Sequence, residues 1–212
     1  MAPRIEIIKS KLLLTEGADA YYFFIAACGA FGVDDVQVMD FGGITDLLPY
    51  LKTLPMLPGY EKVDTIVIAR DAEKNAETAV ANVKKSLRKV KLPVPAEPFD
   101  FTGTAPRVAY VIFPGFQTDA KGKNTLLAGT LEALCLEIVK DNTTFECIDQ
   151  YLECLRSKGR KIARPHKTKL HSYLAGEDDF AGKKIGEASQ AGAWDWNHAR
   201  LKPFKDVLSA MQ

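Results

Sequence analysis

The chain has 212 residues, 47% of them hydrophobic, which is enough for one full core with a helical elaboration but hardly enough for two independent domains. Its formal net charge of +1 gives no overall attraction to nucleic acid, so any phosphate binding must depend on a local basic patch. The longest apolar stretch, residues 21–28, is far shorter than the roughly 20 residues of a membrane-spanning helix, and no secretory signal precedes it. We therefore expect a cytoplasmic protein with no membrane partner.

Four cysteines lie in or near apolar helical patterns: Cys28, Cys135, Cys147 and Cys154. They form no C-x-x-C pair, and no histidine stands at the spacing of a zinc ligand. We predict buried, reduced thiols that have no role in metal binding or redox chemistry.

The first half of the chain alternates between strand and helix patterns. Apolar and β-branched runs predict strands at residues 11–15, 33–40, 65–69 and 107–113, with helices at 19–30, 44–54 and 72–90. Such alternation indicates a mostly parallel four-stranded sheet that helices cover on both faces. The proline-rich residues 92–106 are interpreted as a connection, and residues 119–124 as an exposed loop.

The second half of the chain is predicted to be helical. Helical patterns cover residues 130–140, 145–157, 167–175, 183–191 and 203–211. The sequence therefore predicts an α/β core over residues 1–125 and a helical C-terminal part over residues 126–212 that packs on the same domain.

Acidic residues follow three of the predicted strands. Glu16 follows the first strand, Asp40 ends the second, and Asp71 and Glu73 follow the third. Because the carboxyl ends of parallel strands meet at one edge of a sheet, these side chains are expected to converge. Like charges at close range repel, so a cation is expected between them, and oxygen donors without Cys or His favour Mg²⁺ or Mn²⁺.

The order of these motifs resembles the TOPRIM fold. The resemblance rests on T-E-G-A-D at 15–19, F-G-G at 41–43 and a β-branched strand that ends in D-A-E at 71–73, and it covers roughly residues 10–115. TOPRIM domains occur in topoisomerases, bacterial primases, OLD-family nucleases and recombination mediators of the RecR type. The C-terminal L-E-A-L-C-L and G-A-W-D-W segments resemble small stand-alone prokaryotic TOPRIM-like proteins.

The resemblance implies a role for each acid. Glu16 would be a metal ligand or general base, and Asp71 and Glu73 would be Mg²⁺ ligands. Glu73 stands where Asp is usual, and Ala20 stands where nuclease-type members often carry a further acid. Glu132 is a candidate for a further ligand. Alternative roles are a first-turn or capping position for Asp19, a helix start at Glu73 and a helix-face salt bridge at Glu132.

A basic run between two predicted helices carries no acidic residue. It contains Arg156, Lys158, Arg160, Lys161, Arg164, Lys167 and Lys169. The run is interpreted either as a solvated loop or as a phosphate-binding segment, because phosphoryl chemistry needs cations near the metal. Lys167 or Lys169 would then be the charge stabiliser. The tryptophans at 194 and 196 are predicted to pack among the terminal helices rather than to stack on a base.

The preferred hypothesis is Mg²⁺-dependent phosphodiester chemistry on nucleic acid, of the nuclease type. A TOPRIM-like module that binds nucleic acid or a protein without catalysis is the first alternative. A phosphatase-like domain with Asp71 as nucleophile is the second. Topoisomerase and primase activities are not expected, because the chain lacks the additional domains that those reactions need.

Overall fold

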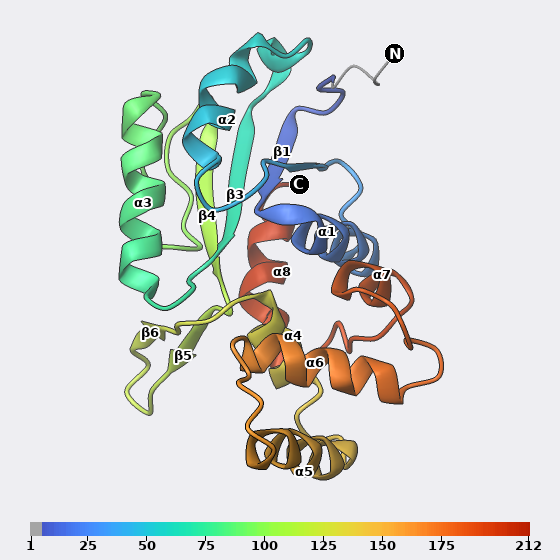
Figure 1. Ribbon diagram of the computed structural model, residues 1–212. Coiled ribbons are helices and arrows are strands. Elements are labelled where there is room, and N and C mark those ends of the chain that lie inside the picture. Colours follow the sequence, from blue (N-terminus) through green and yellow to red (C-terminus); the bar gives the residue numbers. More distant parts are fainter. Residues whose placement is uncertain (1–5) are drawn as a thin grey trace.

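The protein is built around a four-stranded parallel sheet. The computed structural model describes residues 6–212, so the first five residues of the predicted core lie outside it. Strands β1 (Lys11–Thr15), β2 (Gln37–Asp40), β3 (Thr65–Asp71) and β4 (Arg107–Phe113) pair in the order β2-β1-β3-β4. All three pairings are parallel (Figure 1). The predicted α/β class and sheet are confirmed.

Two hydrophobic clusters cover the two faces of this sheet. Helices α2 (Leu47–Thr53) and α3 (Ala76–Lys89) pack on one face, where the strands present Leu12, Leu14 and Ile68. Helices α1 (Gly17–Phe31), α4 (Leu131–Ile138) and α8 (Lys202–Ser209) pack on the other, against Leu13 and Val67. Because successive strand residues point to opposite faces, each buried strand contributes to both clusters.

The remaining helices lie mostly beyond the carboxyl ends of the strands. Helices α5 (Thr144–Ser157) and α6 (Pro165–Gly176) pack together there, and α6 contacts α4, whereas α7 (Ile185–Gln190) packs on α1 (Figure 1). A short antiparallel hairpin of β5 (Phe116–Thr118) and β6 (Asn124–Leu126) encloses the predicted loop at 119–124. Three 3₁₀ turns complete the described elements: Leu54–Met56, Tyr60–Lys62 and Ala199–Leu201.

Three predicted elements begin at least three residues later in the structure, and one of them is the helix predicted from residue 72, which begins at Ala76 after the Asn75 cap. Strand β2 begins at Gln37 rather than at Val33, because the Val33 N–H donates to the Cys28 carbonyl and closes the end of α1. The helix predicted from Ile44 begins only at Leu47. Trp194 is buried, and its Nε1 donates to the Ser189 hydroxyl, which confirms the packing interpretation for that residue.

The predicted burial of all four cysteines is wrong for two of them. Cys28 and Cys135 are buried, but Cys147 and Cys154 are exposed. Both exposed residues lie on α5, an outer helix whose buried residues are Phe145, Ile148 and Leu152. An apolar pattern on one face of a helix does not bury cysteines on its opposite face.

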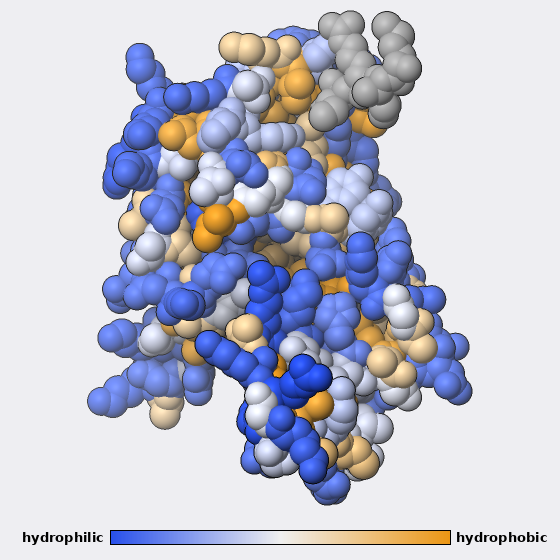
Figure 2. Space-filling model, in the orientation of Figure 1, coloured by the Kyte–Doolittle hydropathy of each residue, from blue (hydrophilic) through white to orange (hydrophobic). Residues whose placement is uncertain are grey.

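No helix within residues 6–212 is long and apolar enough to cross a bilayer. The face in Figure 2 is mostly hydrophilic, with hydrophobic residues scattered over it.

Candidate functional site

Glu16 lies directly after β1, where the sheet register fixes its backbone. Thr15 pairs with Asp40 on one side and with Ala69 on the other, and the Glu16 N–H donates to the Ala69 carbonyl at 3.1 Å. The side chain is nearly buried, with 10% of its surface exposed, and its Oε2 lies 3.4 Å from Arg70 Nε. Among residues 6–212, neither of these two atoms has a hydrogen-bond partner.

The environment of Glu16 favours the protonated carboxyl. Burial raises its pKa above the usual range, and the nearby Glu73 carboxylate adds to this effect, although Arg70 acts in the opposite direction. Arg70 itself is 3% exposed. A buried guanidinium beside Glu16 was not predicted; the alternation of β3 could have indicated it, because Arg70 follows Ile66 and Ile68 on one face.

Asp71 ends β3 and points to the opposite face from Arg70. Its Oδ1 accepts a hydrogen bond of 2.9 Å from the Leu131 N–H, at the first turn of α4. Burial raises the pKa of Asp71 to about 8, and the carboxylates of Glu16 and Glu132 contribute to the rise. Asp71 therefore has a structural role at the N-terminus of α4, and it is also the most strongly perturbed carboxyl of this edge.

Glu73 and Glu132 line the same cavity as Asp71, with a volume of about 490 Å³. Glu73 does not open a helix, because its φ is +56° and its backbone exchanges hydrogen bonds of 2.8 and 2.7 Å with Gly129. This double contact holds the segment before α4 against the end of β3. Glu132 stands in the first turn of α4 with its side chain 15% exposed. The structure thus brings three of the four predicted metal ligands to one cavity.

The fourth predicted ligand, Glu16, does not line this cavity, since its side chain turns toward Arg70 on the other face of the sheet. Within residues 6–212, no three His, Cys, Asp or Glu side chains are gathered closely enough to hold a metal ion. The acids converge on one edge of the sheet as predicted, but their side chains divide between its two sides.

Asp40 and Asp19 have structural partners. Asp40 Oδ1 accepts hydrogen bonds from Gly17 N at 2.9 Å and from Gly42 N at 2.8 Å, which joins the turn after β1 to the turn after β2. Asp19 lies in the first turn of α1 and accepts a bond of 3.2 Å from Gly186 N. Both carboxylates therefore stabilise the loops around the site.

Basic side chains line the same cavity. Arg164, His166 and Lys167 line it from the start of α6, and Lys167 Nζ lies 3.7 Å from Glu132 Oε1. Lys169 does not line this cavity, because its Nζ lies 2.7 Å from Asp149 Oδ1 and over the Phe145 ring. Of the two predicted charge stabilisers, only Lys167 faces the carboxylates.

The rest of the basic run lies outside the cavity. Lys158, Arg160 and Lys161 are exposed in the connection between α5 and α6, and Arg156 pairs with Glu153 at 3.1 Å. Of the basic run, Arg164 and Lys167 therefore line the cavity, and the other members lie outside it.

A parallel α/β protein with carboxylates at its strand ends is the class that this fold and site define. The chain belongs to a family described as a protein of unknown function, DUF3226, which matches residues 10–211. A search of curated proteins finds no match.

Two solved structures are similar over nearly their whole length, and both are of the C-terminal region of the OLD protein of Xanthomonas campestris pv. campestris. The structure phased with mercury is 16% identical, with a TM-score of 0.47 and 97% of each chain covered. The structure phased with platinum is 18% identical, with a TM-score of 0.42, covering 96% of this chain and 94% of the other.

Proposed function

We propose that this protein is a TOPRIM-type enzyme that carries out Mg²⁺- or Mn²⁺-dependent phosphodiester chemistry on nucleic acid. One observation carries the proposal: Asp71, Glu73 and Glu132 line the same cavity as Arg164 and Lys167. Oxygen donors of this kind suit a hard divalent cation. Cations beside them suit the phosphates of a nucleic-acid backbone.

The chemistry of the carboxylates fits such a cation. Crowding and burial raise the pKa of Asp71 to about 8, and the buried Glu16 Oε2 has no hydrogen-bond partner among residues 6–212. A divalent cation would favour the ionised form of both groups. Asp71 and Glu73 would hold it together with Glu16 or Glu132, after a rotation of side chains. The bound ion would supply charge stabilisation at the phosphoryl oxygen and an activated water.

The chain's own residues then divide the remaining work. Glu16, nearly buried and with a raised pKa, is suited to act as a ligand or general base. Lys167 would offset the charge that develops on the phosphate, and Arg164 would bind a neighbouring phosphate of the strand. Lys169 is less suited, because Asp149 already neutralises it.

A second candidate function is a TOPRIM-like module that binds nucleic acid without catalysis. The pairing of Glu16 with Arg70 and the bond from Leu131 N to Asp71 favour this alternative, because both carboxylates already have protein partners. In such a module the basic run would still bind phosphates, and the acids would serve the fold alone.

Cleavage of end-labelled single- and double-stranded DNA and RNA distinguishes the two functions. We expect the parent to cleave at least one substrate with Mg²⁺ or Mn²⁺ and none with EDTA. Asp71→Asn should abolish cleavage, and Asp178→Asn, which removes an exposed carboxylate just beyond the end of α6, should not. Binding without metal-dependent cleavage of any substrate would overturn the enzyme and favour the module.

A further inference from the structure

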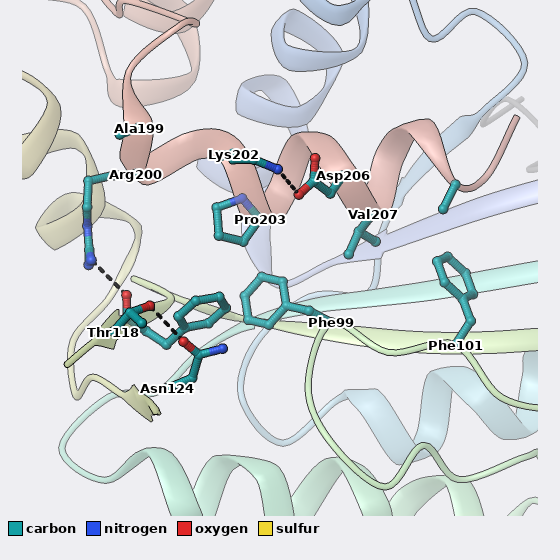
Figure 3. A pocket seen from close by; sticks show the side chains of 12 residues that line it. Phe99, Phe101, Thr118, Asn124, Ala199, Arg200, Lys202, Pro203, Asp206 and Val207 are labelled. Atoms are coloured by element: carbon teal, nitrogen blue, oxygen red, sulfur yellow. Dashed lines mark hydrogen bonds and ion pairs between the residues drawn. The ribbon is translucent and has the colours of Figure 1, made fainter. Parts of the chain in front are cut away.

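A second cavity lies between the β5–β6 hairpin, the segment before β4 and helix α8 (Figure 3). Its volume is about 580 Å³, within the roughly 300–1,000 Å³ of small-molecule sites. It shares no lining residue with the cavity beside Asp71. The proposed phosphodiester chemistry therefore gives this cavity no role.

Aromatic rings form one wall of this cavity. Phe99, Phe101 and Phe116 line it, and the rings of Phe99 and Phe116 meet edge to face at 5.3 Å. Phe99 has a φ of +70°, which a bulky residue rarely adopts. A bond of 2.8 Å from the Phe99 N–H to the Tyr110 carbonyl holds it there. The backbone is thus fixed in an unusual conformation that places an aromatic ring in the wall.

Arg200 supplies a positive charge at the end of the cavity nearest the hairpin. Its Nη1 donates to the Phe116 carbonyl at 2.7 Å, whereas its buried Nε and Nη2 have no partner in the described part of the chain. Among residues 6–212, no carboxylate forms an ion pair with Arg200. Buried donors without partners are rare in folded proteins, and an anion in the cavity could pair with these two once the guanidinium turns toward it.

The other polar residues that line this cavity are compatible with a neutral ring that forms hydrogen bonds. Asp206, the acid of this wall, pairs with Lys202 at 2.6 Å, so it does not repel an anion. The Thr118 hydroxyl donates to Asn124 Oδ1 at 2.7 Å, and the Asn124 Nδ2 group points away from that bond (Figure 3). An amide donor is therefore available for the edge of a ring.

We propose that this cavity binds a nucleotide, with the base against the phenylalanine rings and the phosphate at Arg200. Stacking on aromatic rings suits any base, the amide suits the polar edge of a base, and the guanidinium suits a phosphate. A hydrophobic acid would use the rings and Arg200 but not the amide. The nucleotide is either free or the terminal residue of a strand, since both present the same base and phosphate.

Calorimetric titration with adenosine 5′-monophosphate in EDTA tests the site without the metal chemistry. We expect saturable binding, with adenosine and inorganic phosphate each bound roughly tenfold more weakly or worse, because each lacks one of the two binding groups. Competition by an oligonucleotide with a 5′-phosphate would assign the strand end, and the absence of competition would assign the free nucleotide. No binding of the monophosphate, or equal binding of adenosine, would overturn the proposal.

Two variants on different walls connect the binding to this cavity. Arg200→Gln and Phe101→Leu should each weaken monophosphate binding roughly tenfold, and Phe101→Leu remains informative if removal of the bond to the Phe116 carbonyl unfolds Arg200→Gln. Arg88→Gln, which changes an exposed arginine of α3 outside the cavity and outside the basic run, is the matched control. Asp71→Asn should bind normally, so failure of the metal chemistry does not affect this test. Unchanged binding in folded Phe101→Leu would overturn the proposal.

Discussion

Asp71 has the most strongly raised pKa among the carboxyl groups at the strand ends. Its pKa of about 8 compares with about 3.9 in an unfolded chain, so the folded protein binds an additional proton between these values. Stability from this group is present below about pH 4 and is lost as the pH rises toward 8, at up to about 1.4 kcal/mol for each pH unit.

Asp71→Asn should therefore flatten the dependence of stability on pH. In metal-free buffer we expect the free energy of unfolding of the parent to fall between pH 5 and pH 8, and that of the variant to fall much less. The variant keeps the bond from Leu131 N, because an amide oxygen can accept it. Urea denaturation at several pH values measures both slopes. Parallel slopes would mean that Asp71 is ionised in the folded protein across this range.

Divalent metal should stabilise the parent more than it stabilises Asp71→Asn. Metal that binds only the folded protein stabilises it by about 2.7 kcal/mol at a hundredfold excess over Kd, so Mg²⁺ should raise the melting temperature of the parent. Asp71→Asn should respond much less, and the control Asp178→Asn should respond like the parent. Thermal denaturation with Mg²⁺ and with EDTA provides the comparison. Equal responses in parent and Asp71→Asn would remove Asp71 from the ligands.

The division of the acids between two sides of the sheet shows what the sequence could predict. Position after a strand placed Glu16 and Asp71 at one edge, because register fixes the backbone. The orientation of each side chain depends on neighbours that are distant in sequence, such as Leu131, whose N–H donates to Asp71. Strand alternation predicts the face of the sheet on which Arg70 lies. That Glu16 is its neighbour depends on the pairing of β1 with β3, which the sequence pattern does not show.

At the scale of elements, long buried patterns gave the most accurate predictions. The strands at Lys11–Thr15 and Arg107–Phe113 have the predicted bounds, since continuous apolar runs between turn residues allow few alternatives. The β5–β6 hairpin was not predicted. Its strands have three residues each and are largely exposed, so they lack a hydrophobic pattern.

The connection between α5 and α6 should contribute to nucleic-acid binding if the basic run binds phosphates. Arg160→Glu with Lys161→Glu should weaken binding and lower the slope of log K against log salt by roughly 0.7 to 0.9 for each phosphate that is no longer neutralised. The control is the double variant Lys85→Glu with Arg88→Glu, which makes the same change of charge on the exposed side of α3 and should leave the slope unchanged. Fluorescence anisotropy over a range of salt concentrations measures the slopes. A slope equal to that of the parent would identify the run as a solvated loop.

Helix α8 should be essential for stability because of one ring. Phe204 is 2% exposed, stacks on Phe113 at 5.2 Å and meets Phe99 edge to face at 5.3 Å. Phe204→Ala should lower the free energy of unfolding by about 3–5 kcal/mol. Met56→Ala, at a residue that is 81% exposed, should stay within about 0.5 kcal/mol of the parent. Urea denaturation decides, and similar decreases in both variants would contradict the packing argument.

For the molecule as a whole, the hydrophobic cluster on the α1 face joins the two halves of the chain. It combines Leu13 and Val67 of the sheet with Leu134, Leu170 and Phe204 of the C-terminal part. The two parts of the chain before and after residue 125 differ in secondary structure, but they share one hydrophobic cluster. Neither half can bury its apolar residues alone.

Unfolding should accordingly be a single transition. Both tryptophans, at 194 and 196, lie in the C-terminal part, whereas far-ultraviolet circular dichroism reports helices and strands throughout the chain. The two signals should give the same urea midpoint. Two separated midpoints would show that residues 1–125 and 126–212 unfold independently.

The C-terminal residue Gln212 lies beside β1 and the end of α1. The Gln212 side chain donates to the Gly32 carbonyl at 2.8 Å, the Gln212 carbonyl accepts a bond from Lys11 at 3.3 Å, and α8 covers the sheet face next to α1. During synthesis, strands β1 to β4 and helices α1 and α4 are therefore complete while the part of this sheet face that α8 covers is still exposed. A ribosome that stalls before residue 202 would leave the apolar residues that pack against Phe204, Val207 and Leu208 exposed to chaperones.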